Sequence, residues 1–132
     1  MVNNMKPSYY LKYWVPVILY MGFIFYLSSL PNPIKTLTPE GLDVYFDLPH
    51  FFYHILEYLI LSFLLYRALK VNSKYPQSLA IFITIAYAIT DELHQYFVPG
   101  RIPSILDILI DSFGAIAMQC IINIYKLLKN NL

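Results

Sequence analysis

Residues 90–101 read TDELHQYFVPGR. This stretch closes a long apolar run with acidic, histidine and amide side chains, followed by a Pro-Gly break and an arginine. Charged groups in an apolar segment of membrane length are costly, so they require partners or serve a function. The stretch therefore predicts an apolar chain that is organised around one polar site.

The composition places the chain among integral membrane proteins. Hydrophobic residues make up 58% of its 132 residues and charged residues only 13%, which is more apolar surface than a soluble domain of this length can bury. This length predicts a single domain, residues 1–132. The net charge of +1, without a basic stripe, argues against a nucleic-acid partner. The single cysteine, Cys120, excludes an intrachain disulfide.

Four apolar runs predict four transmembrane helices, at residues 13–30, 48–69, 78–97 and 104–128. Each run is long enough to cross the hydrocarbon core of a bilayer. The first run follows basic residues, as in a signal peptide, but it ends in Ser-Ser-Leu-Pro and lacks a small-x-small cleavage site. We therefore expect a retained helix and an all-α fold, an integral membrane four-helix bundle.

Basic residues predict the orientation, because they accumulate in cytoplasmic segments. Seven lie at the amino terminus, in the second loop and at the carboxyl terminus, namely Lys6, Lys12, Arg67, Lys70, Lys74, Lys126 and Lys129. Two, Lys35 and Arg101, lie in the first and third loops. Both termini are therefore expected to be cytoplasmic, and the first and third loops are expected to face outward from a bacterial cytoplasmic membrane.

Polar residues of three helices fall at one depth, within about two turns of the outward end when each residue adds about 1.5 Å. Residues three and four positions apart also share a helix face. The expected site residues are His54, Glu57 and Tyr58 in the second helix, Asp91, Glu92, His94 and Gln95 in the third, Asp107 and Asp111 in the fourth, and Arg101 over the mouth. One polar pocket is the simplest explanation of the shared depth.

Several chemistries suit this pocket. In acid–base catalysis, Arg101 would hold an anionic substrate. The candidate catalytic residues are His54, Glu57, Asp91, Glu92, His94 and Arg101, and the candidate substrate-binding residues are Arg101, Gln95 and Tyr58. A divalent cation such as manganese or zinc is a second use, with Asp91, His94, Asp107 and Asp111 as ligands. Transfer of protons or ions is a third. A purely structural cluster between helices is the fourth.

Other polar residues are expected to serve packing and interfacial roles. His50 and Tyr53 lie at the outer rim of the second helix, where interfacial residues are common. Gln119 and Asn123 lie deep in the fourth helix, where hydrogen bonds between helices are expected. Gly114 shares a face with Asp111 and would let a neighbouring helix approach closely.

Three motifs resemble the VanZ-like family of small bacterial membrane proteins. They are HILEY at residues 54–58, DELHQYFVPGR at 91–101 and DILIDSFG at 107–114, and the similarity covers roughly residues 27–118, including the serines at 28 and 29. The family is named after a protein linked to resistance to teicoplanin, a glycopeptide that acts outside the cytoplasmic membrane. Many relatives carry an Arg-Lys pair where this chain has His50 and Phe51.

The resemblance implies a cell-envelope protein that affects glycopeptide susceptibility. Together with the outward pocket, it predicts that the chain binds or modifies an anionic envelope lipid or precursor. The alternative is a non-enzymatic protein that binds lipid or conducts protons or ions through the same polar cluster. No nucleophile with the surroundings of an activated serine is evident near the pocket.

Overall fold

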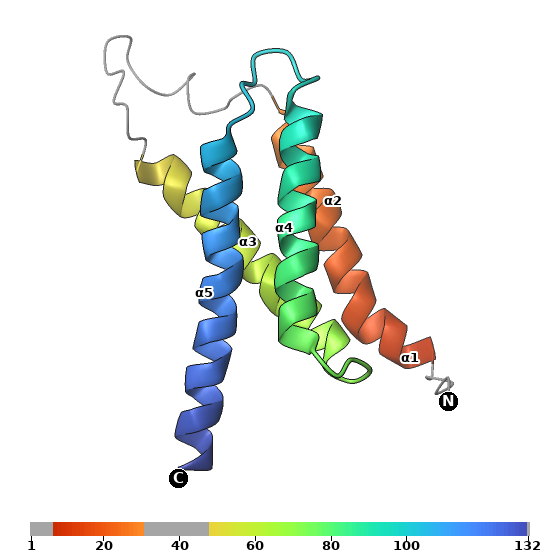
Figure 1. Ribbon diagram of the computed structural model, residues 1–132. Helices are drawn as coiled ribbons and strands as arrows, with labels where there is room; N and C mark the ends of the chain where they lie inside the picture. Colours follow the sequence, from red (N-terminus) through yellow and green to blue (C-terminus); the bar gives the residue numbers. More distant parts are fainter. Residues whose placement is uncertain (1–6, 31–47, 132) are drawn as a thin grey trace.

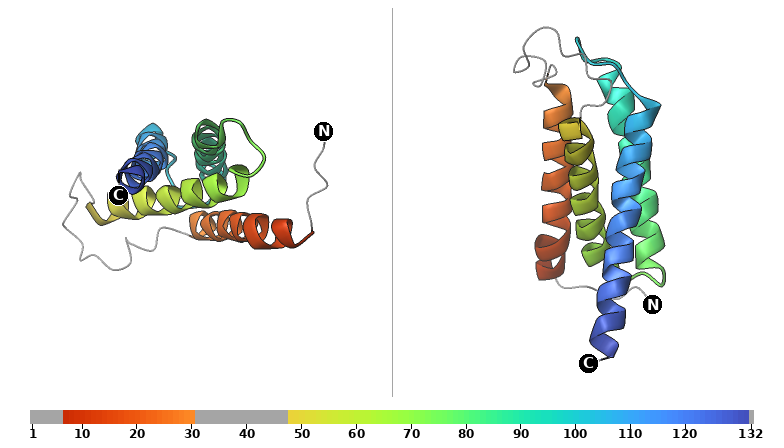
Figure 2. Two further views of the ribbon diagram at one scale, coloured as in Figure 1. Left: turned by 90° about the horizontal axis from the view of Figure 1, so that it is seen from below. Right: turned by 90° about the vertical axis from the view of Figure 1, so that its left-hand side faces the viewer.

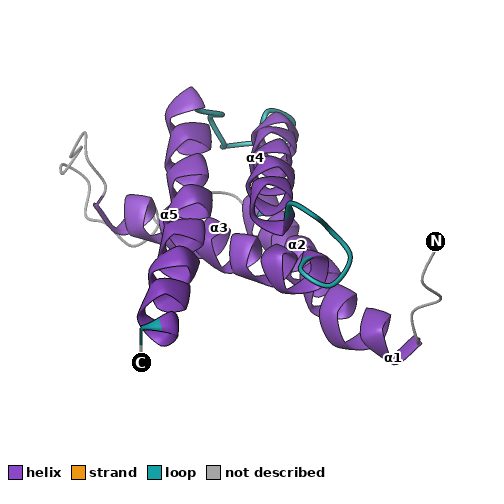
Figure 3. Cartoon of the chain, turned by 60° about the horizontal axis from the view of Figure 1, so that its bottom comes forward, coloured by secondary structure: helices purple, strands orange, loops and turns teal. Residues whose placement is uncertain are grey.

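The computed structural model describes residues 7–30 and 48–131, which form an all-α fold without strands (Figures 1 and 3). The elements are α1 (Pro7–Tyr9), the π-helical turn η1 (Tyr10–Trp14), α2 (Val15–Ser29), α3 (Leu48–Leu69), α4 (Pro76–Gln95) and α5 (Ile105–Asn130). The first three are consecutive and form one long helix. Lys6, Lys35 and the first loop, which the orientation argument uses, lie outside the described residues.

The helix bounds follow from local sequence signals. The first helix begins at Pro7, six residues before its predicted start. It therefore includes the aromatic segment that precedes the apolar run. In α4, Pro76 lies in the first turn, where the missing N–H costs nothing. In α5, the Ser104 hydroxyl caps the helix by accepting a hydrogen bond from the Leu106 amide at 3.1 Å.

The four long helices run alternately up and down, and α3 crosses the bundle obliquely (Figure 1). Seen along the bundle, α2 lies on one side of α3 while α4 and α5 lie on the other side (Figure 2). Helix α3 is in contact with each of the other helices and packs most extensively against α5. The helix that carries His54 is therefore the centre of the fold.

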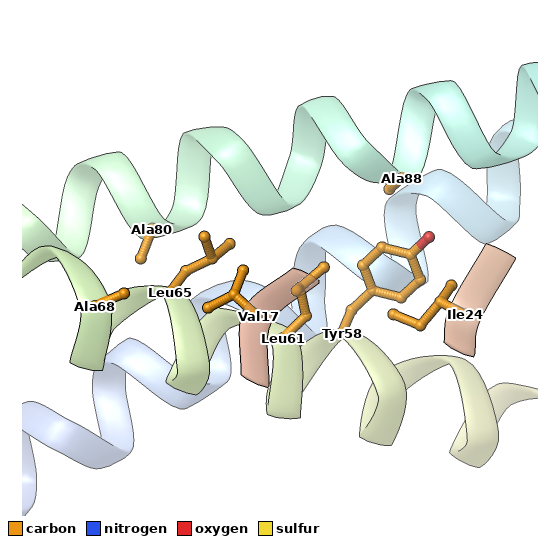
Figure 4. Close-up of a cluster of buried hydrophobic side chains, with 8 residues drawn as sticks. All are labelled: Val17, Ile24, Tyr58, Leu61, Leu65, Ala68, Ala80 and Ala88. Carbon is orange, nitrogen blue, oxygen red and sulfur yellow. The ribbon is translucent and has the colours of Figure 1, made fainter. Parts of the chain in front are cut away.

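A buried apolar cluster joins α2, α3 and α4 (Figure 4). Its members are Val17, Ile24, Tyr58, Leu61, Leu65, Ala68, Ala80 and Ala88. On α4 the buried face consists of small side chains. They are spaced four residues apart and are completely buried: Ala80, Thr84 and Ala88. Small residues on one helix face let α4 lie close to α3, as is usual between membrane helices.

Helices α3 and α5 approach each other closely at Gly114. A Cβ atom at this position would lie 2.5 Å from the carbonyl oxygen of Ile55 and 3.2 Å from its Cα atom. Only a residue without a side chain fits there, which confirms the expectation of close helix approach at this glycine. The contact fixes the register in which the polar face of α5 meets α3.

Polar side chains also join these helices further along the bundle. The Gln119 amide donates to the hydroxyl of Ser62 at 2.7 Å, and the Ser62 hydroxyl donates to the Ala115 carbonyl at 3.0 Å. Gln77 of α4 donates to the side-chain oxygen of Asn123 at 2.8 Å. The expectation that Gln119 and Asn123 form hydrogen bonds between helices is confirmed.

Three helices are long and apolar enough to cross a membrane: Pro7–Ser29, His50–Leu69 and Ile105–Asn130. Four were predicted, and α4 does not meet the same criterion of length and composition. The lower hydropathy of α4 comes partly from Asp91, Glu92 and Gln95, which are buried inside the bundle. Its outer surface is apolar, with Leu79, Phe82, Ile89 and Leu93 exposed.

Candidate functional site

The polar residues gather at the end of the bundle where α2 and α4 end and where α3 and α5 begin (Figure 1). Helix α1 begins and helix α5 ends at the opposite side of the bundle. The up-and-down order of the helices therefore brings together the polar segments that the sequence spreads over residues 54–111.

The main contact of this end is a hydrogen bond between a histidine of α3 and an aspartate of α5. Nδ1 of His54 lies 2.9 Å from Oδ1 of Asp111. The Asp111 side chain is 1% exposed and the His54 side chain 12% exposed. A buried carboxylate that accepts from Nδ1 fixes the imidazole ring and its tautomer, and leaves Nε2 to bind a proton or another partner.

The other acidic groups lie around this pair. Glu57 of α3 lies close enough to four ionisable groups for their charges to interact with its own: His54, Asp111, Asp91 and Arg101. Asp107 of α5 and Glu57 are in turn within electrostatic range of His54. The structure thus brings five of the expected residues of α3, α4 and α5 into one group, namely His54, Glu57, Asp91, Asp107 and Asp111, with Glu57 and Asp107 half-buried at its edge.

Glu92 connects the end of α4 to the start of α5. Its Oε2 atom accepts a hydrogen bond of 2.8 Å from the backbone amide of Ser104, and the side chain is almost completely buried. Ser104 is itself the N-cap of α5. Glu92 therefore holds the α4–α5 loop in place, a structural contact for a residue that the sequence assigned to catalysis.

Two buried carboxylate oxygens have no hydrogen-bond partner in the part of the chain that the structure describes. They are Oδ1 of Asp91 and Oε1 of Glu92. The second oxygen of Asp91 accepts from the Gln95 amide at 3.2 Å. Buried polar atoms are nearly always hydrogen-bonded, so these two oxygens are suited to hold a proton or a polar ligand.

The sequence predicted that Arg101 lies over the mouth of the pocket. In the structure, its guanidinium is directed to the end of α2 instead. Its Nε atom donates to the Leu30 carbonyl and its Nη2 atom to the Leu27 carbonyl, both at 2.9 Å. The last carbonyls of a helix lack partners within the helix, and a cation stabilises that end. Arg101 therefore caps α2 from the α4–α5 loop, where Gly100 adopts a φ of 82°.

His94 also faces α2. Its Nε2 atom lies 3.0 Å from the hydroxyl of Ser29, and its ring stacks on Phe25 with centroids 4.1 Å apart. The sequence grouped His94 with Asp91 as catalytic and metal-binding residues, but these contacts direct it to a different neighbour. His94 and Arg101 together attach the end of α2 to the rest of the bundle.

Tyr58 and Gln95 lie behind the site. Tyr58 is 1% exposed, and its hydroxyl points from the apolar cluster toward α4 (Figure 4) without a hydrogen-bond partner among the described residues. Gln95 is 4% exposed and bonded to Asp91. Direct contact of either side chain with a substrate would need the bundle to open.

The described residues include one group able to hold a metal ion: His50, His54 and Asp107. One ligand atom from each lies within 4.8 Å of the other two, and the two histidine rings have centroids 4.3 Å apart. Only Asp107 belongs to the ligand set expected from the sequence. The position of His50 at the outer rim of the helix predicted an interfacial residue, although its spacing of four residues from His54 puts both rings on one helix face.

A comparison with protein-family models finds a match to VanZ/LLP1 over residues 13–126, most of the chain. No curated protein matches the chain, and neither does any solved structure. The match extends beyond residues 27–118, the part that carries the resemblance noted from the sequence, and it includes every residue of the candidate site.

Proposed function

This chain belongs to the VanZ/LLP1 family, and from that premise we propose that it is an integral membrane protein of the bacterial cell envelope whose polar end binds an anionic envelope lipid or lipid-linked precursor. Binding or modification of the head group changes susceptibility to glycopeptides such as teicoplanin. Family membership and three helices of membrane-spanning character support this proposal.

In the proposed orientation all four helices cross the bacterial cytoplasmic membrane, and the polar end faces outward. Basic residues support it: Arg67 and Lys70 lie at the end of α3, and Lys126 and Lys129 at the end of α5, on the side opposite to Asp111. Basic residues accumulate on the cytoplasmic side. The exposed apolar surface of α4 suits a fourth span that turns its polar groups inward.

The observation that carries the proposal is the hydrogen bond between His54 and Asp111. A histidine held by a buried carboxylate, near the membrane surface and partly exposed, has the arrangement of a reactive group. With Nδ1 engaged by Asp111, the remaining nitrogen transfers a proton to the head group or binds a metal ion that contacts it. Glu57 and Asp107, both half-buried, complete the surface that faces the head group.

The variant His54→Asn tests this role. An asparagine amide can donate to Asp111 from the position of Nδ1 but has no counterpart of Nε2, so the contact between helices is kept while the reactive nitrogen is lost. We expect a deletion strain that produces this variant to have the glycopeptide susceptibility of the empty deletion strain, with wild-type amounts of protein in the membrane.

Gln119→Leu is the matched control for the helix contact, because Gln119 joins the same two helices in the other half of the bundle. It should complement the deletion. Full complementation by His54→Asn would contradict the proposed role of the histidine. If deletion itself leaves glycopeptide susceptibility unchanged, the envelope role is contradicted.

A second function, the binding and passage of protons, is favoured by the two unpartnered carboxylate oxygens of Asp91 and Glu92. Ionisable groups inside membrane proteins often form proton relays. This function predicts proton flux into liposomes that contain the purified protein, and loss of the flux in Asp91→Asn. Equal flux in protein-free liposomes would exclude it.

A further inference from the structure

We propose that His50, His54 and Asp107 bind a divalent transition-metal ion of the zinc class at the outward end of the bundle, with Asp111 orienting His54. His50 and His54 form a His-x-x-x-His pair on α3, and Asp107 approaches from α5. The ligand set differs from the one that the sequence predicted, which included Asp91 and His94.

The distances fit such an ion. Zinc binds histidine nitrogen and carboxylate oxygen at about 2.0–2.2 Å, which places tetrahedral ligand atoms about 3.4 Å apart. The three ligand atoms lie within 4.8 Å of one another, so they must approach one another by no more than about 1.4 Å to reach the tetrahedral spacing. Two imidazoles and one carboxylate favour zinc and related ions over magnesium or calcium, which prefer oxygen ligands.

Asp111 supplies an independent sign of metal binding. Histidines that bind metals usually donate their other ring N–H to a carboxylate, which orients the ring and makes the ligand nitrogen more basic. Asp111 holds Nδ1 of His54 at 2.9 Å and is itself 1% exposed. The ligand atom of His54 is therefore Nε2, and the buried carboxylate fixes its direction before any metal arrives.

A bound divalent cation would also offset the negative charge of the carboxyl groups at the site. Five carboxyl groups lie at this end, Glu57, Asp91, Glu92, Asp107 and Asp111, and those that are ionised repel an anionic head group. Arg101 directs two of its donor atoms at backbone carbonyls of α2. A divalent cation with three protein ligands keeps an open position, where a phosphate or carboxylate oxygen can bind. This bridging step rests on the proposed function, whereas metal binding does not.

Zinc titration of the full-length protein, purified in detergent and stripped with a chelator, tests the metal site. We expect one-to-one binding for the wild type and its loss in His50→Ala and His54→Asn. Asp111→Asn should weaken binding by about 10–100-fold. His94→Asn, which removes the histidine packed on α2, should bind zinc like the wild type; circular dichroism and size-exclusion profiles confirm that each variant is folded.

The ligand set is overturned if the wild type does not bind zinc stoichiometrically, or if His94→Asn abolishes binding while His50→Ala retains it. Nanodiscs of phosphatidylcholine with and without phosphatidylglycerol test the bridging step: the anionic lipid should be enriched around the protein only when zinc is present. Zinc binding without this enrichment overturns the bridge and leaves the metal site standing. If the protein binds zinc but its deletion leaves glycopeptide susceptibility unchanged, the metal site stands and the proposed envelope function is contradicted.

Discussion

Helices α3 and α5 are joined by polar side chains in two regions, and the two regions use different chemistry. At the end of the bundle where α3 and α5 begin, the pair is His54 with Asp111, two ionisable groups in a cluster of further carboxylates. In the other half, it is Ser62 with Gln119, a hydroxyl and an amide. We call these regions the ionisable region and the neutral region.

The difference bears on the structural alternative, in which the polar cluster only holds the bundle together. The neutral region shows that α3 and α5 can be joined through a hydroxyl and an amide alone, at low cost in an apolar environment. Charged groups cost far more to bury. Uncharged polar groups thus suffice for a contact between these two helices, and the presence of an ionisable pair where α3 and α5 begin argues for a chemical role.

The largest effect is expected at Gly114, the contact that sets the register for both regions. Gly114→Ala places a Cβ atom 2.5 Å from the Ile55 carbonyl, so the helices must separate, at a cost of about 1–3 kcal/mol in unfolding free energy. Denaturant unfolding in micelles measures it. Gly22→Ala is the matched control, since its Cβ would meet no atom within 4 Å. Equal stability of the two variants would contradict the close contact.

Asp111→Asn should separate function from stability in the ionisable region. The asparagine oxygen still accepts from Nδ1 of His54, so the unfolding free energy should fall by less than in Gly114→Ala. The loss of the negative charge makes the histidine a weaker base and ligand, and we expect the glycopeptide susceptibility of a complemented deletion strain to return to that of the deletion. Wild-type susceptibility together with lower stability would assign Asp111 a structural role.

Gln119→Leu should show the opposite pattern in the neutral region. Removing an interhelical hydrogen bond inside a membrane protein costs about 0.6–1.7 kcal/mol, which lowers the unfolding free energy by that amount. Susceptibility in the complemented strain should be unchanged. A functional loss as large as that of Asp111→Asn would remove the distinction between the two regions.

The smallest effect is expected for Gln77→Ala. Its amide donates to Asn123 at 2.8 Å, but this hydrogen bond lies at the exposed edge of the neutral region. The change in unfolding free energy should be a few tenths of a kcal/mol, below that of Gln119→Leu, because water competes for exposed donors. A loss of unfolding free energy as large as that of Gln119→Leu would show that water is excluded from this edge as it is from the centre of the neutral region.

The sequence by itself determined the helical fold class, the approximate helix positions and the presence of polar groups at the same end of three helices. Composition and the length of each apolar run decide these properties, because a helix adds a fixed rise per residue and repeats its face every three to four residues. The glycine contact at Gly114 and the hydrogen-bonding role of Gln119 were predictable for the same reason: both follow from the position of one residue on one helix face.

Only the tertiary structure decided which groups meet. Arg101 and His94 turn to α2, where two carbonyls accept from Arg101 and the Ser29 hydroxyl lies within hydrogen-bond distance of His94. Asp111 turns instead to His54. His50 joins the site because the start of α3 lies near the start of α5, which brings His50 and His54 within reach of Asp107. Helical periodicity gives the direction of a side chain from its own axis, but the neighbour in that direction depends on the crossing angle and on close contacts such as Gly114 with Ile55.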